Sequence, residues 1–207
     1  MHTDTQPFEI MSLFSDDGER KYLNTKERKR FYKSRKVIKD ISERSFVELL
    51  FWTGCRISEA LQLNIMRVNV EDCFVVFKTL KQHGKREGKR FRIVHLPRKF
   101  MRKLNRIHAV LEMQLDEHAN KFRNLWSFGR QKGWKLVKAV MDKAKIFGVR
   151  ATPKGLRHTY GVNAIYRGAP LLSLQIWMGH QSLKTTSIYL KVIGMEDRAY
   201  AKRTWKV

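Results

Sequence analysis

The sequence predicts a mainly α-helical domain that contains a small antiparallel β-sheet. Apolar residues recur at helical spacing before and after a central stretch, and that stretch holds two short runs rich in β-branched and aromatic residues. The 207 residues are 43% hydrophobic, which is enough for one packed core. We therefore expect one domain over residues 20–207, preceded by a flexible leader over residues 1–19.

The N-terminal segments differ sharply in charge. Acidic side chains are scattered through residues 1–19, which is typical of a loose leader. Residues 20–39 are strongly basic, and either Asn24 or Thr25 is suited to cap a helix there.

Two helices are expected next, separated by a glycine turn. Apolar residues recur with helical period from Ile41 to Leu50, and Gly54 breaks this helix. The following helix is expected to begin near Arg56 and to carry Ala60 and Leu61.

The period then changes from helical to β-type. Cys73–Phe77 and Phe91–Leu96 are predicted to be the strands of a hairpin, with a long basic tip from Lys81 to Arg90. From Lys99 onward the pattern is helical again and is interrupted at glycine and proline residues.

Charge indicates the class of partner. The chain has 43 Lys and Arg against 19 Asp and Glu, a formal net charge of +24. Such an excess attracts polyanions, with nucleic acid first among them. A membrane surface is disfavoured because no basic amphipathic helix with a clean apolar face stands at a terminus.

Composition also bears on compartment and cofactors. Two cysteines favour a reducing compartment, and the sequence has neither a membrane-span-length apolar run nor a signal peptide, so a cytoplasmic, nucleoid-associated protein is expected. No Cys/His cluster or paired-carboxylate site points to a metal, and no cofactor is expected.

Five places carry candidate chemistry: Thr53–Leu61, Lys81, Thr152–Thr159, Trp177–Ser182 and Thr185–Tyr189. Each alone has an ordinary structural explanation. Arg56 fits an exposed helix surface, His180 a turn, and Tyr189 an apolar core.

In this order and spacing, the segments closely resemble the tyrosine recombinase (phage integrase) family. The matching motifs are the T-G-x-R-I-S-E-x-L box, the x-L-R-H-T box, the M-G-H turn and the T-T-x-x-Y motif, and the resemblance runs from about Tyr22 to the end. It implies the DNA breaking-rejoining catalytic-domain fold. It also implies a site-specific recombinase that acts in integration, excision, inversion or resolution through a 3′-phosphotyrosyl intermediate.

The resemblance assigns roles to the main candidates. Tyr189 would be the nucleophile, and Arg56 and Arg157 would hold the non-bridging oxygens of the scissile phosphate. His180 would donate a hydrogen bond to the same phosphate. Arginine suits this task because its planar fork donates two hydrogen bonds and stays charged.

The leaving-group acid is expected on the hairpin. By resemblance Lys81 protonates the departing 5′ oxygen, with Lys78 and Lys85 as alternatives. The basic residues of the hairpin are expected to bind DNA: Lys78, Lys85, Arg86 and Lys89.

Three further residues complete the predicted site. Glu59 would orient the cationic cluster, and His158 would pack beneath Arg157 as structural support. Lys154 stands where the family usually has histidine. A lysine donates to a phosphate oxygen, but it accepts a proton from Tyr189 only if its pKa is lowered.

The resemblance also bears on domains and partners. No separate N-terminal core-binding domain is expected, which predicts weak intrinsic affinity for double-stranded DNA or help from an accessory DNA-bending protein. Self-association into a synaptic tetramer is expected, with a terminal helix around Tyr200 and Trp205 docking on a neighbour or on its own domain. The alternatives are a type IB topoisomerase-like enzyme and a non-enzymatic DNA-binding regulator, with an RNA-binding protein more distant.

Overall fold

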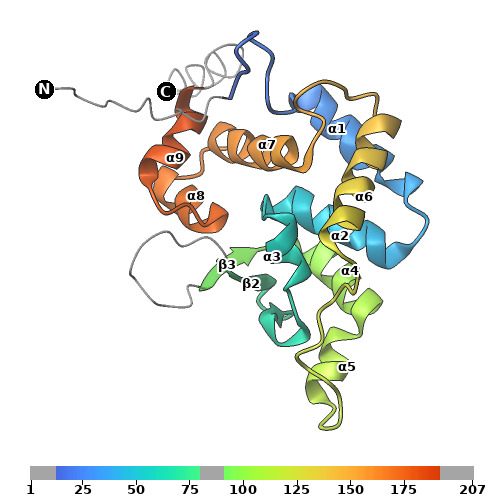
Figure 1. Ribbon diagram of the computed structural model, residues 1–207. Helices are drawn as coiled ribbons and strands as arrows, with labels where there is room; N and C mark the ends of the chain where they lie inside the picture. Colours follow the sequence, from blue (N-terminus) through green and yellow to red (C-terminus); the bar gives the residue numbers. More distant parts are fainter. Residues whose placement is uncertain (1–12, 80–90, 192–207) are drawn as a thin grey trace, which may run out of the picture.

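The computed structural model describes residues 13–79 and 91–191. Within these ranges the chain forms helices around a small sheet (Figure 1). The elements in chain order are α1 (Thr25–Ser34), η1 (Arg35–Val37), α2 (Ile41–Thr53), α3 (Ile57–Leu61), η2 (Ile65–Arg67), β1 (Val68–Asn69), β2 (Phe74–Lys78), β3 (Phe91–His95), α4 (Arg98–His108), α5 (Val110–Leu115), α6 (Arg130–Lys143), α7 (Pro153–Tyr166), α8 (Leu171–Met178), α9 (Leu183–Ser187) and η3 (Ile188–Lys191). The predicted fold class, mainly α with a small antiparallel sheet, is confirmed.

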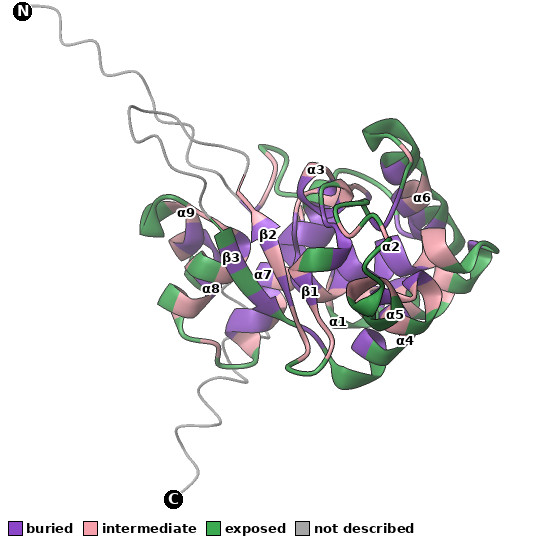
Figure 2. Cartoon of the chain, turned by 90° about the horizontal axis from the view of Figure 1, so that it is seen from below, coloured by how far each residue is buried: buried purple, intermediate pink, exposed green. Residues whose placement is uncertain are grey.

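Helix α2 lies at the centre of the main core. It packs against α4, α6 and α7, and most of its side chains are buried (Figure 2). Phe46, Val47 and Leu49 are shielded from solvent by these neighbours. Burial on several faces explains why α2 is apolar around most of its circumference.

The helix starts follow local capping chemistry. The Asn24 side chain accepts from the backbone of Glu27, whose carboxylate accepts in return from the Asn24 backbone, and this capping box fixes the start of α1. The helix predicted within the basic segment 20–39 is thus present with Asn24 as its cap, and it is followed by a short 3₁₀ turn, η1.

The sheet has three antiparallel strands in the order β1-β2-β3. Val75 faces Val94 and Phe77 faces Arg92 across β2 and β3. The two-residue strand β1 was not expected from the sequence. Cys73 was predicted to be in the strand, but it adopts a left-handed conformation with φ 57°, because the chain turns there between β1 and β2.

A second, smaller apolar cluster lies on the other side of α7. It joins α7 to α8 and η3, and it includes Leu13 and Tyr22 from the N-terminal segment. Leu13 is buried, and Phe14 pairs with Arg20 in an isolated bridge. Of the residues expected in the loose leader, Leu13 and Phe14 pack onto the domain and residues 16–19 are exposed, whereas residues 1–12 lie outside the described ranges.

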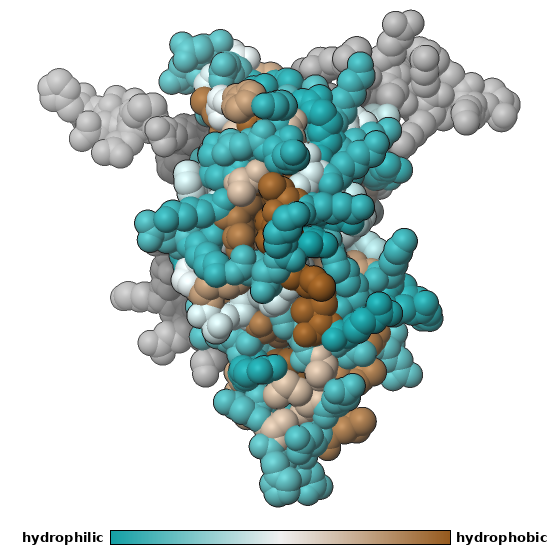
Figure 3. All heavy atoms as spheres, turned by 90° about the vertical axis from the view of Figure 1, so that its right-hand side faces the viewer, coloured by the Kyte–Doolittle hydropathy of each residue, from teal (hydrophilic) through white to brown (hydrophobic). Residues whose placement is uncertain are grey.

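On the face shown in Figure 3, hydrophilic side chains predominate and apolar side chains gather in patches. In the described part of the chain, no helix has both the length and the apolar character needed to cross a membrane.

Candidate active site

The turn after α2 brings two arginines together. Gly54 ends the helix in a left-handed conformation with φ 60°, and a Cβ there would lie 2.6–2.8 Å from the Tyr160 side chain. Both features require glycine. The Gly54 carbonyl accepts a 2.7 Å hydrogen bond from Arg157, and the same turn places Arg56 at the N-cap of α3.

Glu59 is a buried carboxylate held between two arginines. Its Oε1 accepts from Arg56 at 3.0 Å, and Arg92 donates to both carboxylate oxygens at 2.7 and 3.2 Å. Burial alone would raise the pKa of Glu59, but the charge and hydrogen bonds of Arg92 outweigh it and lower the pKa. The carboxylate therefore stays ionised and restrains the Arg56 side chain.

Arg92 connects three parts of the structure. In addition to its bonds with Glu59, its Nε donates to the carbonyl of Trp177 near the end of α8 at 2.9 Å. It also contacts the Thr79 hydroxyl at 3.3 Å, and its guanidinium lies over the Phe77 ring. The hairpin, α3 and the end of α8 are thus fixed relative to one another.

Arg157 is buried beside the cleft on α7. It donates to the carbonyls of Gly54 and Met178, at 2.7 and 2.5 Å. Burial, together with the charge of Arg56, lowers the pKa of Arg157 to about 10. The guanidinium therefore remains charged at neutral pH.

The Tyr189 hydroxyl meets a histidine of α7. Its Oη lies 3.2 Å from Nδ1 of His158. The phenol ring packs directly on the α7 backbone, since a Cβ on Gly161 would lie only 2.5–2.7 Å from ring atoms. Burial raises the pKa of Tyr189 to about 12, although the charges of Arg157 and Arg56 act in the opposite direction.

His180 lies on the other side of the phenol. Its ring is nearly parallel to that of Tyr189, at 14° and 6.3 Å between centroids. Its Nδ1 lies 3.0 Å from the Thr186 hydroxyl. Burial, with the nearby charge of Arg157, lowers the pKa of His180 to about 3, so the ring is neutral at pH 7.

These groups border one cleft of about 1240 Å³. Its described lining carries five Lys and Arg side chains and no carboxylate, so it attracts anions. The basic lining residues are Lys21, Arg56, Arg130, Lys154 and Arg157. An anion held by the arginines would lie in the same cleft as the phenolic hydroxyl, as nucleophilic attack requires.

The structure brings most of the predicted site residues together. Six line the cleft: Arg56, Lys154, Arg157, His158, His180 and Tyr189. Glu59 lies behind Arg56, and Lys78 ends β2. Lys81, Lys85, Arg86 and Lys89 lie outside the described residues. The roles given to all of these residues remain predictions.

Sequence reasoning missed Arg92. The signal was available in the predicted strand, where alternation places Arg92 on the same face as the apolar Val94 and Leu96. All three are buried. A charged residue on the apolar face of a strand requires an opposite charge nearby, and Glu59 supplies it.

Across residues 13–79 and 91–191, no group of three or more His, Cys, Asp and Glu side chains is arranged to hold a metal ion.

Comparison with known sequences identifies relatives of the chain. The model of the phage integrase family matches residues 21–194. The chain is 31% identical over 157 residues to tyrosine recombinase XerA of Pyrococcus furiosus, covering 73% of this chain and 51% of the relative. It is 32% identical over 155 residues to tyrosine recombinase XerD of Staphylococcus epidermidis, covering 72% and 50%. The chain thus spans about half the length of these curated relatives.

Solved structures share the fold. The crystal structure of XerA recombinase superposes with a TM-score of 0.70 at 23% identity, covering 90% of this chain and 65% of that chain. The XerH site-specific recombinase bound to its difH substrate superposes with a TM-score of 0.67 at 20% identity, covering 93% and 60%. Because the family model matches most of the sequence, the chain belongs to the phage integrase family, that of the tyrosine recombinases.

Proposed function

We propose that this chain is the catalytic domain of a site-specific DNA recombinase that cleaves and rejoins double-stranded DNA through a 3′-phosphotyrosyl intermediate on Tyr189. The observation that carries the proposal is the convergence of Tyr189 with Arg56 and Arg157 in one cationic cleft. These residues come from three separate elements, and a phosphodiester needs both charge neutralisation and a nucleophile.

The arginines retain donors for a phosphate. Arg157 uses one N–H of each terminal nitrogen on backbone carbonyls, which leaves three of its five donors. One terminal nitrogen of Arg56 donates to Glu59, and the Arg56 side chain is still 32% exposed and lines the cleft. These bonds to Glu59 and to the backbone carbonyls preorganise the two guanidinium groups for the non-bridging oxygens. Lys154, also in the cleft, would donate to the same phosphate.

The proposed cleavage forms one bond to phosphorus and breaks another. Tyr189 Oη attacks phosphorus, the bond from phosphorus to the 5′ oxygen breaks, and that oxygen takes up a proton. Lys81 of the hairpin is our candidate donor, with Lys78 and Lys85 as alternatives. If the Thr186 hydroxyl donates to Nδ1 of His180, the ring proton is on Nε2, which is then free to donate to the phosphate.

The partners follow from the same chemistry. Double-stranded DNA is the substrate we propose, supported by the cationic cleft and by the XerH relative, which is described as bound to its difH substrate. Acting on chromosomal or plasmid DNA would associate the protein with the nucleoid. Assembly into a synaptic tetramer, with or without a DNA-bending accessory protein, remains part of the proposal.

A covalent-capture experiment tests this function. The protein is incubated with a pool of duplexes that carry a randomised segment and a nick, so that the short cleaved strand diffuses away and the adduct accumulates. Adducts are isolated under denaturing conditions, and the trapped DNA is sequenced. Tyr189→Phe removes only the hydroxyl. Tyr32→Phe is the matched control, because Tyr32 packs on Phe51 and does not line the cleft.

The result expected is a 3′-linked adduct at a defined sequence with the wild type and Tyr32→Phe, and none with Tyr189→Phe. Adducts at many unrelated sequences, together with supercoil relaxation, would favour the topoisomerase-like alternative. Selective binding with no adduct would favour the DNA-binding regulator.

A further inference from the structure

In the function proposed above, on which this inference rests, no group has been assigned to remove the phenolic proton. We propose that Nδ1 of His158 accepts the proton of Tyr189 Oη as the oxygen attacks phosphorus. His158 was predicted to be only a structural support beneath Arg157. Its contact with the hydroxyl instead makes it a candidate catalytic residue.

The geometry supports this assignment. Nδ1 of His158 lies 3.2 Å from Tyr189 Oη, within the reach required of a general base. His158 is 2% exposed and sits on α7, next to Arg157 in sequence, so it is held rigidly beside the phosphate-binding group. Its other ring nitrogen, Nε2, is buried without a hydrogen-bond partner in the described part of the structure.

Neighbouring groups are less suited to accept the proton. Lys154 stands where the family usually has histidine, and a protonated ammonium has only donors. The His180 ring stacks over the phenol ring, and its Nδ1 is engaged with Thr186. His158 is hydrogen-bonded to Tyr189 Oη, and its Nδ1 has a lone pair that can accept the phenolic proton.

The protonation states fit an acceptor. Burial, then the charges of Lys154, Arg157 and Lys21, lower the pKa of His158 to about 4, so the ring is neutral at pH 7. Lys154 and Arg157 lie on its own helix, and Lys21 precedes α1. His180 follows α8 and is neutral, and Tyr189 is on η3.

Substrate binding would make His158 a stronger base. A phosphate bound by the cleft cations offsets the positive charges that depress its pKa. Tyr189, whose pKa is raised to about 12, does not lose its proton unaided at neutral pH. The acceptor is therefore needed while the new bond forms rather than before it.

The step balances without a further reactant. The Oη–H bond breaks and its proton moves to Nδ1, the Oη–P bond forms, the bond from phosphorus to the 5′ oxygen breaks, and that oxygen takes a proton from the lysine donor proposed above. The resulting imidazolium lies beside the negative charge of the pentavalent phosphorus. In rejoining, the 5′ hydroxyl returns its proton to the lysine as it attacks phosphorus, the Oη–P bond breaks, and the imidazolium returns its proton to the departing phenolate.

The first test uses the free protein and is independent of DNA cleavage. Nitrogen NMR of ¹⁵N-histidine-labelled protein, with His158 assigned through His158→Gln, reports which ring nitrogen carries the proton. We expect a bare, hydrogen-bonded Nδ1 whose resonance shifts in Tyr189→Phe. A protonated Nδ1, which would donate to the phenol, overturns the proposal even if the enzyme is active.

The second test is single-turnover adduct formation on the duplex selected by covalent capture. We expect His158→Gln and His158→Ala to form adduct about 10²–10⁴-fold more slowly, with imidazole restoring part of the rate of His158→Ala. A 5′ sulfur leaves without being protonated, so a duplex that carries it rescues only variants that lack the general acid. It should not rescue the His158 variants, which lack the general base.

His108→Ala is the matched control, because His108 is also buried and lies outside the cleft lining. It should cleave at the wild-type rate and not respond to imidazole. If the wild type cleaves and His158→Ala cleaves at the same rate, this inference alone is overturned. The same holds if His158→Ala cleaves slowly and imidazole does not restore its rate. A wild type that forms no adduct on any duplex overturns the proposed function, and this inference with it.

Discussion

Two clusters of polar side chains, one at the cleft and one beside α4, contain the same kinds of buried group. Each has a carboxylate paired with two cations, and the histidines beside them, two in the cleft and one near α4, have a pKa lowered to about 3 or 4. The cleft cluster contains Glu59, Arg56, Arg92, His158 and His180, and the α4 cluster contains Glu48, Arg35, Lys103, Ser45 and His108.

The difference lies in what the groups leave unused. In the α4 cluster, His108 Nε2 lies 3.2 Å from the Ser45 hydroxyl, and its ring meets Trp126 edge-on. In the cleft cluster, His158 Nε2 has no hydrogen-bond partner among residues 13–79 and 91–191, and Arg56 keeps donors facing a cavity. A satisfied buried network stabilises a fold, whereas an incompletely satisfied one beside a cationic cleft is suited to bind and transform an anion.

The largest expected effect comes from neutralising each carboxylate. Glu59→Gln leaves Arg92, whose side chain is 4% exposed, charged and unpaired, so we expect a loss of about 3–5 kcal/mol in unfolding free energy. Glu48→Gln should cost about 2 kcal/mol, because Arg35 and Lys103 are 19% and 32% exposed and regain water. Urea unfolding measures both.

Activity separates the two clusters further. At a temperature where both variants are folded, Glu59→Gln should slow adduct formation at least about tenfold, since Arg56 loses its restraint, and Glu48→Gln should not. Equal rates in the two variants would show that Glu59 contributes to stability alone.

The next effect is a pH dependence shared by both clusters. The pKa of His108 is lowered from 6.5 to about 4, mainly by burial and then by the charge of Arg123. The unfolded chain therefore binds more protons between about pH 4 and 6.5, and stability falls as pH drops through this window. The loss from His108 is about 3 kcal/mol at pH 4.

Variants and DNA distinguish the two contributions to this pH dependence. His108→Phe should flatten the curve of unfolding free energy against pH by its own share. Added duplex DNA should reduce the shares of His158 and His180 but not that of His108, because the phosphate offsets the charges of Lys154, Arg157 and Arg56. A wild-type curve that is flat from pH 6.5 to 4.5 would contradict the buried neutral state of these histidines.

The sequence predicts features of the two clusters that depend on residues close together in the chain, but not contacts between residues far apart in it. The motif segments and the helix break at Gly54 were readable because they follow local spacing. The pairing of Arg92 with Glu59 crosses from β3 to α3. Alternation along the strand would have indicated that Arg92 is buried, but it could not have identified Glu59 as the partner.

The contact between His158 and Tyr189 lay beyond sequence reasoning for a similar reason. It depends on how η3 packs against α7, and that packing in turn depends on Gly161. A tyrosine after the T-T motif suggests a nucleophile, but periodicity does not reveal which of two histidines its hydroxyl meets. The hairpin residues around Lys81 lie outside the described ranges, so their expected role is untested.

A smaller effect is expected from filling the space under the phenol. Gly161→Ala places a methyl group 2.5–2.7 Å from Tyr189 ring atoms. Overpacking costs about 1–3 kcal/mol, and alanine's higher helix propensity offsets about 1 kcal/mol, so the net loss is about 1 kcal/mol. The displaced hydroxyl should nevertheless lower the adduct rate more than tenfold.

Gly133→Ala is the control for this substitution. Its methyl group would meet Phe46 at 3.0 Å and Ile57 at 3.2 Å in the main core, and none of these nearest atoms belongs to Tyr189. Adduct formation should stay at the wild-type rate. Should Gly161→Ala also keep that rate, the close packing of Tyr189 on α7 would not be needed for catalysis.

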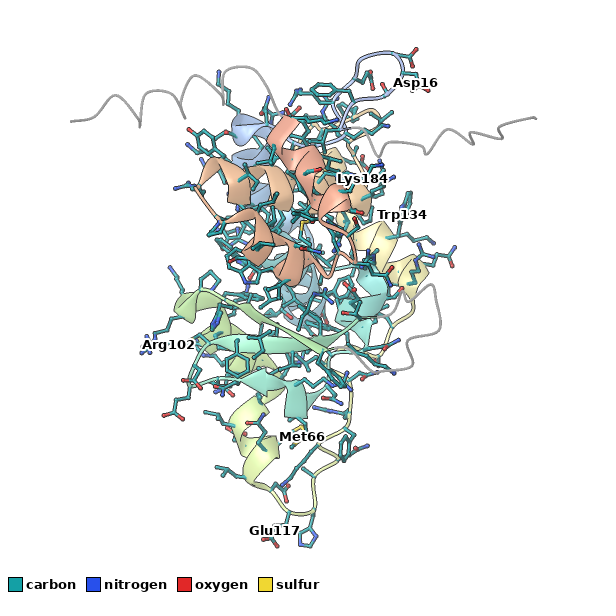
Figure 4. The ribbon with its side chains drawn as sticks, turned by 90° about the vertical axis from the view of Figure 1, so that its left-hand side faces the viewer. Asp16, Met66, Arg102, Glu117, Trp134 and Lys184 are labelled. Atoms are coloured by element: carbon teal, nitrogen blue, oxygen red, sulfur yellow. The ribbon has the colours of Figure 1, made fainter. Side chains whose placement is uncertain are left out.

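The smallest expected effect distinguishes charges in the cleft from charges elsewhere. Trp134, which borders the cleft, and Arg102 on α4 lie on opposite sides of the molecule (Figure 4). Lys154→Gln should weaken DNA binding by about 1 kcal/mol and lower the slope of log affinity against log salt by about one, since one counterion fewer is released. Arg102→Gln removes the same charge and should leave the slope unchanged. Equal slope changes in both variants would mean that DNA senses the +24 charge of the whole chain rather than the cleft, and Lys154 would then have no specific place in phosphate binding.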